Sequence, residues 1–259
     1  MMNKGLKIAL VTALFCALGL VCYAISKMNV ERRHQVTCAG VKVEFADGFN
    51  FVTAEDIEGY LKKEYGTYVG QRLDSLDLMK VEKILAGKGA ILKTDAYTTP
   101  DGYLNVKVYQ REPVVRFQKG STGFYADEKG FIFPLQNNYT SRVPIVDGAV
   151  PLNVTADYKG EAKTPQEKLW LSRVIAMVAY MDGSKVWAEN ISQITVEPDG
   201  DLVMVPREGK EVFIFGQPTD IAAKFEKMGK YYTAIVPDKG EGHYSTVNVK
   251  YKDQIVCRK

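Results

Sequence analysis

Residues 104–118 read LNVKVYQREPVVRFQ, and this stretch divides the chain into two parts. Apolar side chains alternate with polar ones from Leu104 to Val108, which predicts a strand that is buried on one face only. Pro113 has no backbone N–H to donate, so a central strand should not run through it. We therefore expect one domain to close by residue 111 and a second domain to begin at residue 112.

Upstream of this point, residues 38–111 predict a small domain with the element order strand, helix, helix, strand, strand. Alternation over residues 41–45 indicates the first strand. Thr53 and Asp77 each precede an apolar helical pattern and are suited to N-cap a short helix. Residues 91–99 are strand-like, and the alternating strand that follows them completes the domain.

Downstream, residues 112–256 predict a strand-rich mixed β domain with two helices, so the chain as a whole is expected to be of the α+β class. A Thr-Pro-x-Glu capping box at residues 164–167 begins the first helix, and spaced apolar residues at 221–228 mark the second. A last strand is expected at residues 247–251, and residues 257–259 are expected to form a C-terminal tail.

Near the N-terminus, Ile8 to Ile25 read IALVTALFCALGLVCYAI, a run of 18 residues without a charge. A helix of this length covers roughly 27 Å, which is close to the hydrocarbon thickness of a bilayer. A cleaved signal peptide is the alternative, but its apolar region is usually only about 7–15 residues long. We therefore expect a retained transmembrane helix at residues 8–25, with a cytoplasmic tail at residues 1–7 and a juxtamembrane linker at residues 26–37.

The charge of the chain is concentrated at its N-terminus. The 259 residues carry a formal net charge of +3, whereas the first 33 residues alone carry +4. The remaining residues are therefore close to neutral, and a nucleic-acid partner loses its main electrostatic support. We expect no nucleic acid among the partners.

A search for catalytic or metal-binding patterns is negative. The sequence contains no G-x-S-x-G, G-x-G-x-x-G, P-loop, C-x-x-C or H-E-x-x-H motif, and its only histidines are His34 and His243. We expect no catalytic residue, no metal and no cofactor. A membrane-anchored cell-wall hydrolase, or another enzyme with a site that these motifs do not reveal, stays open as the alternative. Whether Cys38 and Cys257 are free also stays open, because the four cysteines do not form a disulfide framework.

Four segments, in their order along the chain, resemble one bacterial family. FVTAEDI at residues 51–57 and VYQREPV at residues 108–114 resemble a POTRA domain. GFYADEKG at residues 123–130 resembles the hairpin that opens the β domain of the cell-division family FtsQ (DivIB in other bacteria). YSTVNVKY at residues 244–251 resembles the final strand of that domain, and the overall composition is most similar to the Bacteroidetes members.

The resemblance implies a non-enzymatic single-pass protein of the inner membrane, located at the division septum with its C-terminal part in the periplasm. Such a protein is a divisome scaffold that links and regulates septal peptidoglycan synthesis through the bitopic proteins FtsL and FtsB. The resemblance also implies contacts between the POTRA domain and other divisome proteins, without indicating which residues make them.

In the family, the last strand accepts a strand from FtsB, and the exposed edge supplies main-chain hydrogen bonds. By matching position, the resemblance implies partner contacts at Val247, Asn248, Val249, Lys250 and Tyr251, with Lys250 as the basic contact and Tyr251 as the aromatic one. A tryptophan that the family carries further along has no match in this chain. The alternative is that Val247, Val249 and Tyr251 simply face the core.

Overall fold

The computed structural model describes residues 4–49, 51–136 and 139–259. Within the N-terminal helix α1 (Lys4–Gln35), side chains are described for residues 13–28. The expected cytoplasmic tail at residues 1–7 therefore lies partly outside the described residues.

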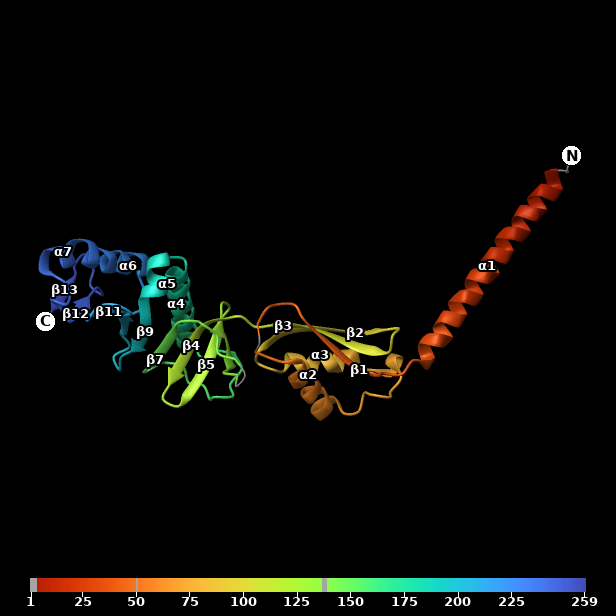
Figure 1. The fold of residues 1–259 in the computed structure, drawn as a ribbon, viewed down its shortest axis with the longest axis horizontal. Coiled ribbons are helices and arrows are strands. Elements are labelled where there is room, and N and C mark those ends of the chain that lie inside the picture. Colours follow the sequence, from red (N-terminus) through yellow and green to blue (C-terminus); the bar gives the residue numbers. More distant parts are fainter. Residues whose placement is uncertain (1–3, 50, 137–138) are drawn as a thin grey trace. The chain divides into compact units, whose positions relative to one another are not determined.

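Contacts divide the chain into two compact units (Figure 1). The first unit contains Met1–Gly48 with Thr53–Tyr109, and the second contains Phe49–Val52 with Gln110–Lys259. The first is built on a 3-stranded sheet and the second on a 10-stranded sheet, and both sheets are accompanied by helices. The predicted α+β class is confirmed.

Helix α1 is 32 residues long and continues through residues 26–35, which we expected to be a linker. Its large apolar side chains are exposed: Leu14, Phe15, Leu18, Leu20, Val21, Tyr23, Ile25 and Met28. Among the described residues, no helix combines the length and the apolar character that are needed to cross a membrane. This finding does not support the predicted transmembrane helix at residues 8–25.

The first unit has the predicted order of strands and helices. Its elements after α1 are β1 (Gly40–Phe45), α2 (Ala54–Tyr60), the π-helix η1 (Leu61–Tyr65), the 3-10 helix η2 (Leu73–Ser75), α3 (Leu78–Ala86), β2 (Ile91–Thr99) and β3 (Tyr103–Gln110). The strand order in the sheet is β1-β3-β2, with β1 parallel to β3.

The helix caps of the first unit are the ones that the sequence predicts. The Thr53 hydroxyl accepts a hydrogen bond from Asp56 N at 3.2 Å, and the Asp56 carboxylate accepts one from Thr53 N at 2.9 Å. The Asp77 carboxylate accepts a hydrogen bond from Lys80 N at 2.9 Å. These bonds satisfy amides that a helix start otherwise leaves without a partner.

The second unit is built from short strands and helices. Its elements are β4 (Pro113–Lys119), β5 (Thr122–Asp127), β6 (Phe131–Pro134), β7 (Ile145–Gly148), β8 (Gly160–Glu161), α4 (Pro165–Asp182), α5 (Lys185–Asn190), β9 (Ile191–Val196), β10 (Leu202–Pro206), β11 (Val212–Gly216), α6 (Ile221–Lys230), the π-helix η3 (Tyr231–Ile235), α7 (Val236–Lys239), β12 (Thr246–Asn248) and β13 (Val256–Arg258). The strand order is β13-β12-β11-β10-β9-β7-β4-β5-β6-β8.

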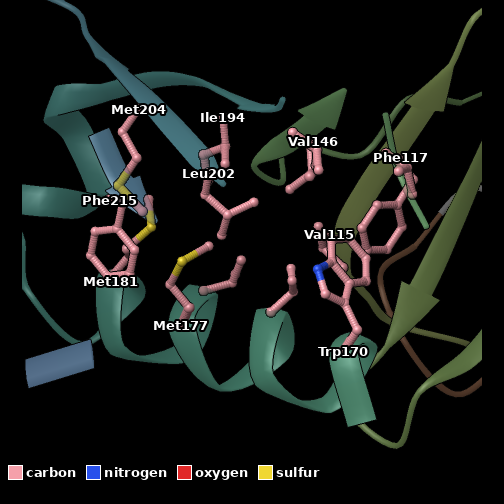
Figure 2. Packing of buried hydrophobic residues seen from close by; sticks show 14 of the residues in the cluster. Val115, Phe117, Val146, Trp170, Met177, Met181, Ile194, Leu202, Met204 and Phe215 are labelled. Atoms are coloured by element: carbon pink, nitrogen blue, oxygen red, sulfur yellow. The ribbon is translucent and has the colours of Figure 1, made fainter. Parts of the chain in front are cut away.

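The core of the second unit lies between α4 and the large sheet. Figure 2 shows Trp170, Met177 and Met181 of α4 facing side chains from five strands, namely Val115, Phe117, Val146, Ile194, Leu202, Met204 and Phe215. Apart from Glu167, the buried residues of α4 form one apolar stripe: Trp170, Leu171, Val174, Met177, Val178 and Met181. Full burial of each such side chain contributes roughly 1.5–3 kcal/mol.

The second unit includes Phe49–Val52, which come from much earlier in the chain. The Phe51 ring packs edge-on against the rings of Tyr139, Tyr125 and Phe133, with centroid distances of 4.8, 5.9 and 6.4 Å. The amide of Gln110 joins this segment to the start of the unit, since its oxygen accepts from Val52 N at 2.9 Å. Sequence periodicity gave no sign of this contact, because it joins residues far apart along the chain.

In the described part of the second unit there are four α-helices, whereas the sequence predicts two. The predicted helices are α4 and α6. The additional ones, α5 and α7, contain only 6 and 4 residues. A helix this short spans at most two turns, so it leaves no periodic apolar pattern to detect.

Glu167 anchors the start of α4. Its carboxylate accepts hydrogen bonds from Asn153 N at 2.8 Å and from Thr164 N at 2.9 Å, while the Thr164 hydroxyl accepts from Glu167 N at 3.2 Å. Burial alone would raise the pKa of Glu167, but the backbone hydrogen bonds outweigh it and the pKa is lowered. The charged carboxylate is therefore stabilised in the folded state.

We expect Glu167→Gln to lower the free energy of unfolding of the second unit by about 1–2 kcal/mol at pH 7, because one charge-assisted hydrogen bond is lost. A lowered folded-state pKa stabilises the fold above the unfolded-state pKa of about 4.3, and this stabilisation is lost as the pH falls through the folded-state value. The deficit of the variant should therefore shrink in acid. Urea unfolding of the full chain from pH 7 to pH 3 measures it through tryptophan fluorescence, since Trp170 and Trp187 both lie in this unit.

Glu161→Gln is the matched control, because the exposed Glu161 carboxylate forms a surface ion pair with Lys168 and such pairs contribute little to stability. It should leave the unfolding midpoint unchanged at every pH. An equal loss of stability in the two variants would contradict the role of Glu167.

Candidate functional site

The predicted last strand lies inside the sheet and not at its edge. β12 pairs with β11 in parallel and with β13 antiparallel, so that Val247 lies opposite Phe213 on one side and Cys257 on the other. The expectation that Val247–Tyr251 forms the exposed edge is therefore wrong. Residues 249–255 reverse the chain. Residues 256–258 then pair with β12 as β13, which is the edge strand of the sheet, although residues 257–259 were expected to form a C-terminal tail.

The five predicted contact residues lie in different environments. Val247 and Val249 are fully buried in the core, as the alternative reading of the strand expected. Asn248 is half-buried, and its side-chain oxygen accepts a hydrogen bond from Lys250 N at 3.0 Å. Tyr251 does not face the core, since 46% of its surface is exposed.

Lys250 is held beside Tyr251 by an ion pair. Its ammonium lies 2.8 Å from a carboxylate oxygen of Asp201 and 5.4 Å from the centre of the Tyr251 ring. The hydrogen bond that Lys250 donates to the Asp201 carboxylate, and the negative charge of that carboxylate, raise the pKa of Lys250. Gly216 makes room for this arrangement, because a Cβ atom there would lie 2.6 Å from Lys250 Cβ.

A groove of about 890 Å³ lies between α6 and the chain reversal that joins β12 to β13. Among its lining residues are five lysines and three carboxylates: Lys224, Lys227, Lys230, Lys250, Lys252, Asp220, Glu226 and Asp253. Tyr251 and Ile255 add apolar surface to the same groove. The groove is therefore net basic, and it lies at the chain reversal that leads into the edge strand β13.

Two lysines of α6 are part of the structure of this groove. The Lys227 ammonium donates hydrogen bonds to the carbonyl oxygens of Val249 and Tyr251, which fixes the start of the chain reversal against α6. Lys224 is almost fully buried and donates to Gln217 O at 2.6 Å. Burial lowers the pKa of Lys224. No sequence motif singles out these residues, although their spacing of three along a predicted helix places them on one face.

The lining of the groove combines charged and apolar side chains. Its lining residues include no serine, cysteine or histidine that could act as a nucleophile with a neighbouring base. In residues 4–49, 51–136 and 139–259, no group of three His, Cys, Asp or Glu side chains could hold a metal ion. Cys38 and Cys257, whose state the sequence left open, are both free.

Comparison with known proteins agrees with this division of the chain. A POTRA-like domain model matches residues 36–109, and a family model described as FtsQ/DivIB, C-terminal related, matches residues 112–258. The protein is thus of the class in which a POTRA-like domain precedes a β domain. The chain belongs to the FtsQ/DivIB family, and this supports a role as a cell-division scaffold. No curated protein matches the chain.

We expect Gly216→Ala to destabilise the second unit, because Gly216 has a φ of +75° and the added Cβ would collide with Lys250. The left-handed backbone alone costs an alanine about 1–2 kcal/mol. The matched control is Gly229→Ala in α6, where nothing lies within 4 Å of an added Cβ and alanine favours the helix. Urea unfolding followed by tryptophan fluorescence should show a lower midpoint for the first variant only, and equal midpoints would contradict the close approach of Lys250.

Proposed function

We propose that this protein is a non-enzymatic single-pass scaffold of the divisome that links and regulates septal peptidoglycan synthesis. Its partners are FtsB-type and FtsL-type bitopic proteins, which bind by strand addition at the C-terminal edge of the large sheet. The observation that carries the proposal is the open edge of this sheet beside a net basic groove. Membership of the FtsQ/DivIB family supports it.

Strand addition fits this edge for a physical reason. An edge strand presents a row of backbone N–H and C=O groups that have no neighbour in the sheet, and an extended segment can pair with them. The large sheet is open and ends at β13 on this side. Lys250 and Tyr251 lie next to this edge, where they can contact side chains of an added strand.

The charge of the groove favours an acidic partner segment. Carboxylates near Lys250 and Lys252 would speed association and set the register of the added strand, while an aromatic residue such as Tyr251 contributes more to affinity. We therefore propose that partner contact involves Val247–Tyr251, with Lys250 as the basic contact and Tyr251 as the aromatic contact.

We also propose that α1 anchors the protein in the inner membrane at the septum, with the two units in the periplasm. Support comes from the sequence. The uncharged run is Ile8–Ile25, and its first five residues lie outside residues 13–28, for which the side chains of α1 are described. The exposed apolar side chains within residues 13–28 fit a lipid environment.

The remaining parts of the proposal concern the domains. We propose that residues 38–111 form the POTRA domain and residues 112–256 the β domain, which agrees closely with the extents of the two family matches. The POTRA domain would contact other members of the divisome.

We expect Tyr251→Ala to weaken binding of an FtsB-type partner about 30-fold, the equivalent of about 2 kcal/mol, because an exposed interface aromatic is removed. Lys250→Glu should slow association and reverse its salt dependence, because an attractive charge becomes repulsive. Calorimetry and stopped-flow mixing with the periplasmic segment of FtsB from the same organism measure these effects on the full chain.

Two variants outside the proposed site serve as controls. Tyr97→Ala removes a tyrosine of the first unit whose exposure of 45% matches that of Tyr251. Lys168→Glu reverses the charge of a lysine that is ion-paired with Glu161 of β8, at the opposite end of the sheet from β13. Both should bind as the parent does. If Tyr251→Ala and Lys250→Glu also bind unchanged while the fold is intact, the C-terminal edge is not the contact site.

We expect the anchor to be retained. N-terminal sequencing of protein from native membranes should begin at or near Met1, because the apolar run is longer than that of a signal peptide. A reporter that is active only in the periplasm should be active after fusion to Lys259. A mature chain that begins near Ile25 would contradict the anchor, and a silent reporter would contradict the topology.

A further inference from the structure

The edge strand β13 is attached to the sheet more weakly than the strand beside it. Val247 of β12 and the adjacent Val249 are fully buried in the core. Of the three residues of β13, Val256 and Cys257 are half-buried and Arg258 is exposed, so that the strand has no fully buried side chain. Segments with little buried apolar surface open locally at a small fraction of the free energy of global unfolding.

The connection to β13 is also weakly held. The hydrogen bonds of Lys227 fix the carbonyl oxygens of Val249 and Tyr251, whereas residues 252–254 are exposed and Ile255 packs only partly against the core. Asp253 adopts a left-handed φ of 58°, which is uncommon for a residue other than glycine. Within the described residues, the side chains of residues 252–258 make no hydrogen bond or ion pair. Backbone bonds hold β13, among them the one from Ser245 N to Arg258 O at 2.8 Å.

We propose that β13 is a displaceable strand, and that the acceptor for a partner's strand is the edge of β12 that β13 covers. The proposal rests on the strand addition proposed above, and it places the added strand on β12 in the position of β13, not outside β13. An incoming extended segment takes the place of β13, regains the same ladder with Thr246–Asn248, and leaves the anchored strand β12 in position. This exchange explains how Asn248 and its neighbours become accessible although β13 covers them.

The position of Cys257 determines which type of side chain the incoming strand must have there. Cys257 lies opposite Val247 and packs partly against the core. A replacing residue must therefore be small and apolar at this one position, whereas its neighbours take the outward positions of Val256 and Arg258. When β13 leaves, the positive charge of Arg258 leaves with it, while Lys250, two residues after β12, stays paired with Asp201 and available to a carboxylate of the new strand.

A reversible disulfide between β12 and β13 tests the proposal on the full chain. Thr246 and Arg258 are register partners, and both are at least partly exposed, so Thr246→Cys with Arg258→Cys can join the strands with little disturbance of the core. Cys16 and Cys22 are replaced by serine and Cys257 by alanine, to prevent wrong pairing. The probe is a labelled synthetic peptide that copies residues 253–259, with alanine in place of Cys257.

The reduced form should bind the peptide, and the oxidised form should bind it at least tenfold more weakly, with full recovery on reduction. The single variant Thr246→Cys, treated with the same oxidant, controls for oxidation alone and should bind as the reduced form does. Equal binding by the oxidised and reduced forms would overturn the proposal, because the peptide would then add outside β13. Absence of binding by the reduced form would overturn it as well.

Hydrogen exchange of the unmodified full chain is a second, independent measurement. The amides of residues 256–258 should exchange at least 100-fold faster than those of β11, because β13 opens alone, and the amides of β12 that pair with β13 should lose protection with it. Equal protection of β13 and β11 would overturn the proposal. Binding of the FtsB segment is measured in the same disulfide assay. If the reduced form binds the peptide but not the FtsB segment, the proposal of a displaceable strand is supported and the proposed partner is contradicted.

Discussion

The packing of α4 against the large sheet is the interaction on which the second unit depends. The apolar stripe of this helix covers side chains from β4, β7, β9, β10 and β11, which lie as much as a hundred residues apart in the sequence. A sheet with one apolar face must bury that face, and a single helix that crosses several strands does so with few residues. The same core extends to side chains of β5, β6 and β12, so most strands of the sheet share it.

An open sheet that is covered in this way has two edges. At the C-terminal edge, next to β12 and β13, a second helix covers the sheet. α6 packs behind this end through Phe225 and Met228, which join the same core as α4. Its other face places Lys224 and Lys227 beside the chain reversal. The same helix therefore stabilises the sheet and forms one wall of the basic groove, so the core determines where the groove lies.

For a protein that recruits others, this arrangement separates stability from recognition. β12 is held by buried valines and stays with the core, whereas β13 is held mainly by backbone hydrogen bonds. Backbone pairing is available to any extended segment, so specificity must come from side chains at alternate positions and from the charge of the groove. A scaffold needs affinity that other divisome components can modulate, and a short strand of low local stability is suited to this.

The local structure was determined by the sequence alone. The caps at Thr53, Asp77 and Thr164, the order of elements in the first unit and the apolar stripe of α4 depend on residues a few positions apart, and all agree with the structure. The position of residues 247–251 was decided by tertiary structure. Whether a strand is central or an edge depends on which distant segment pairs with it, and alternation reports only which face is buried. The pairing of β13, the lysines of α6 beside it and the contact of Phe51 with Tyr139 all join residues that the local pattern cannot connect.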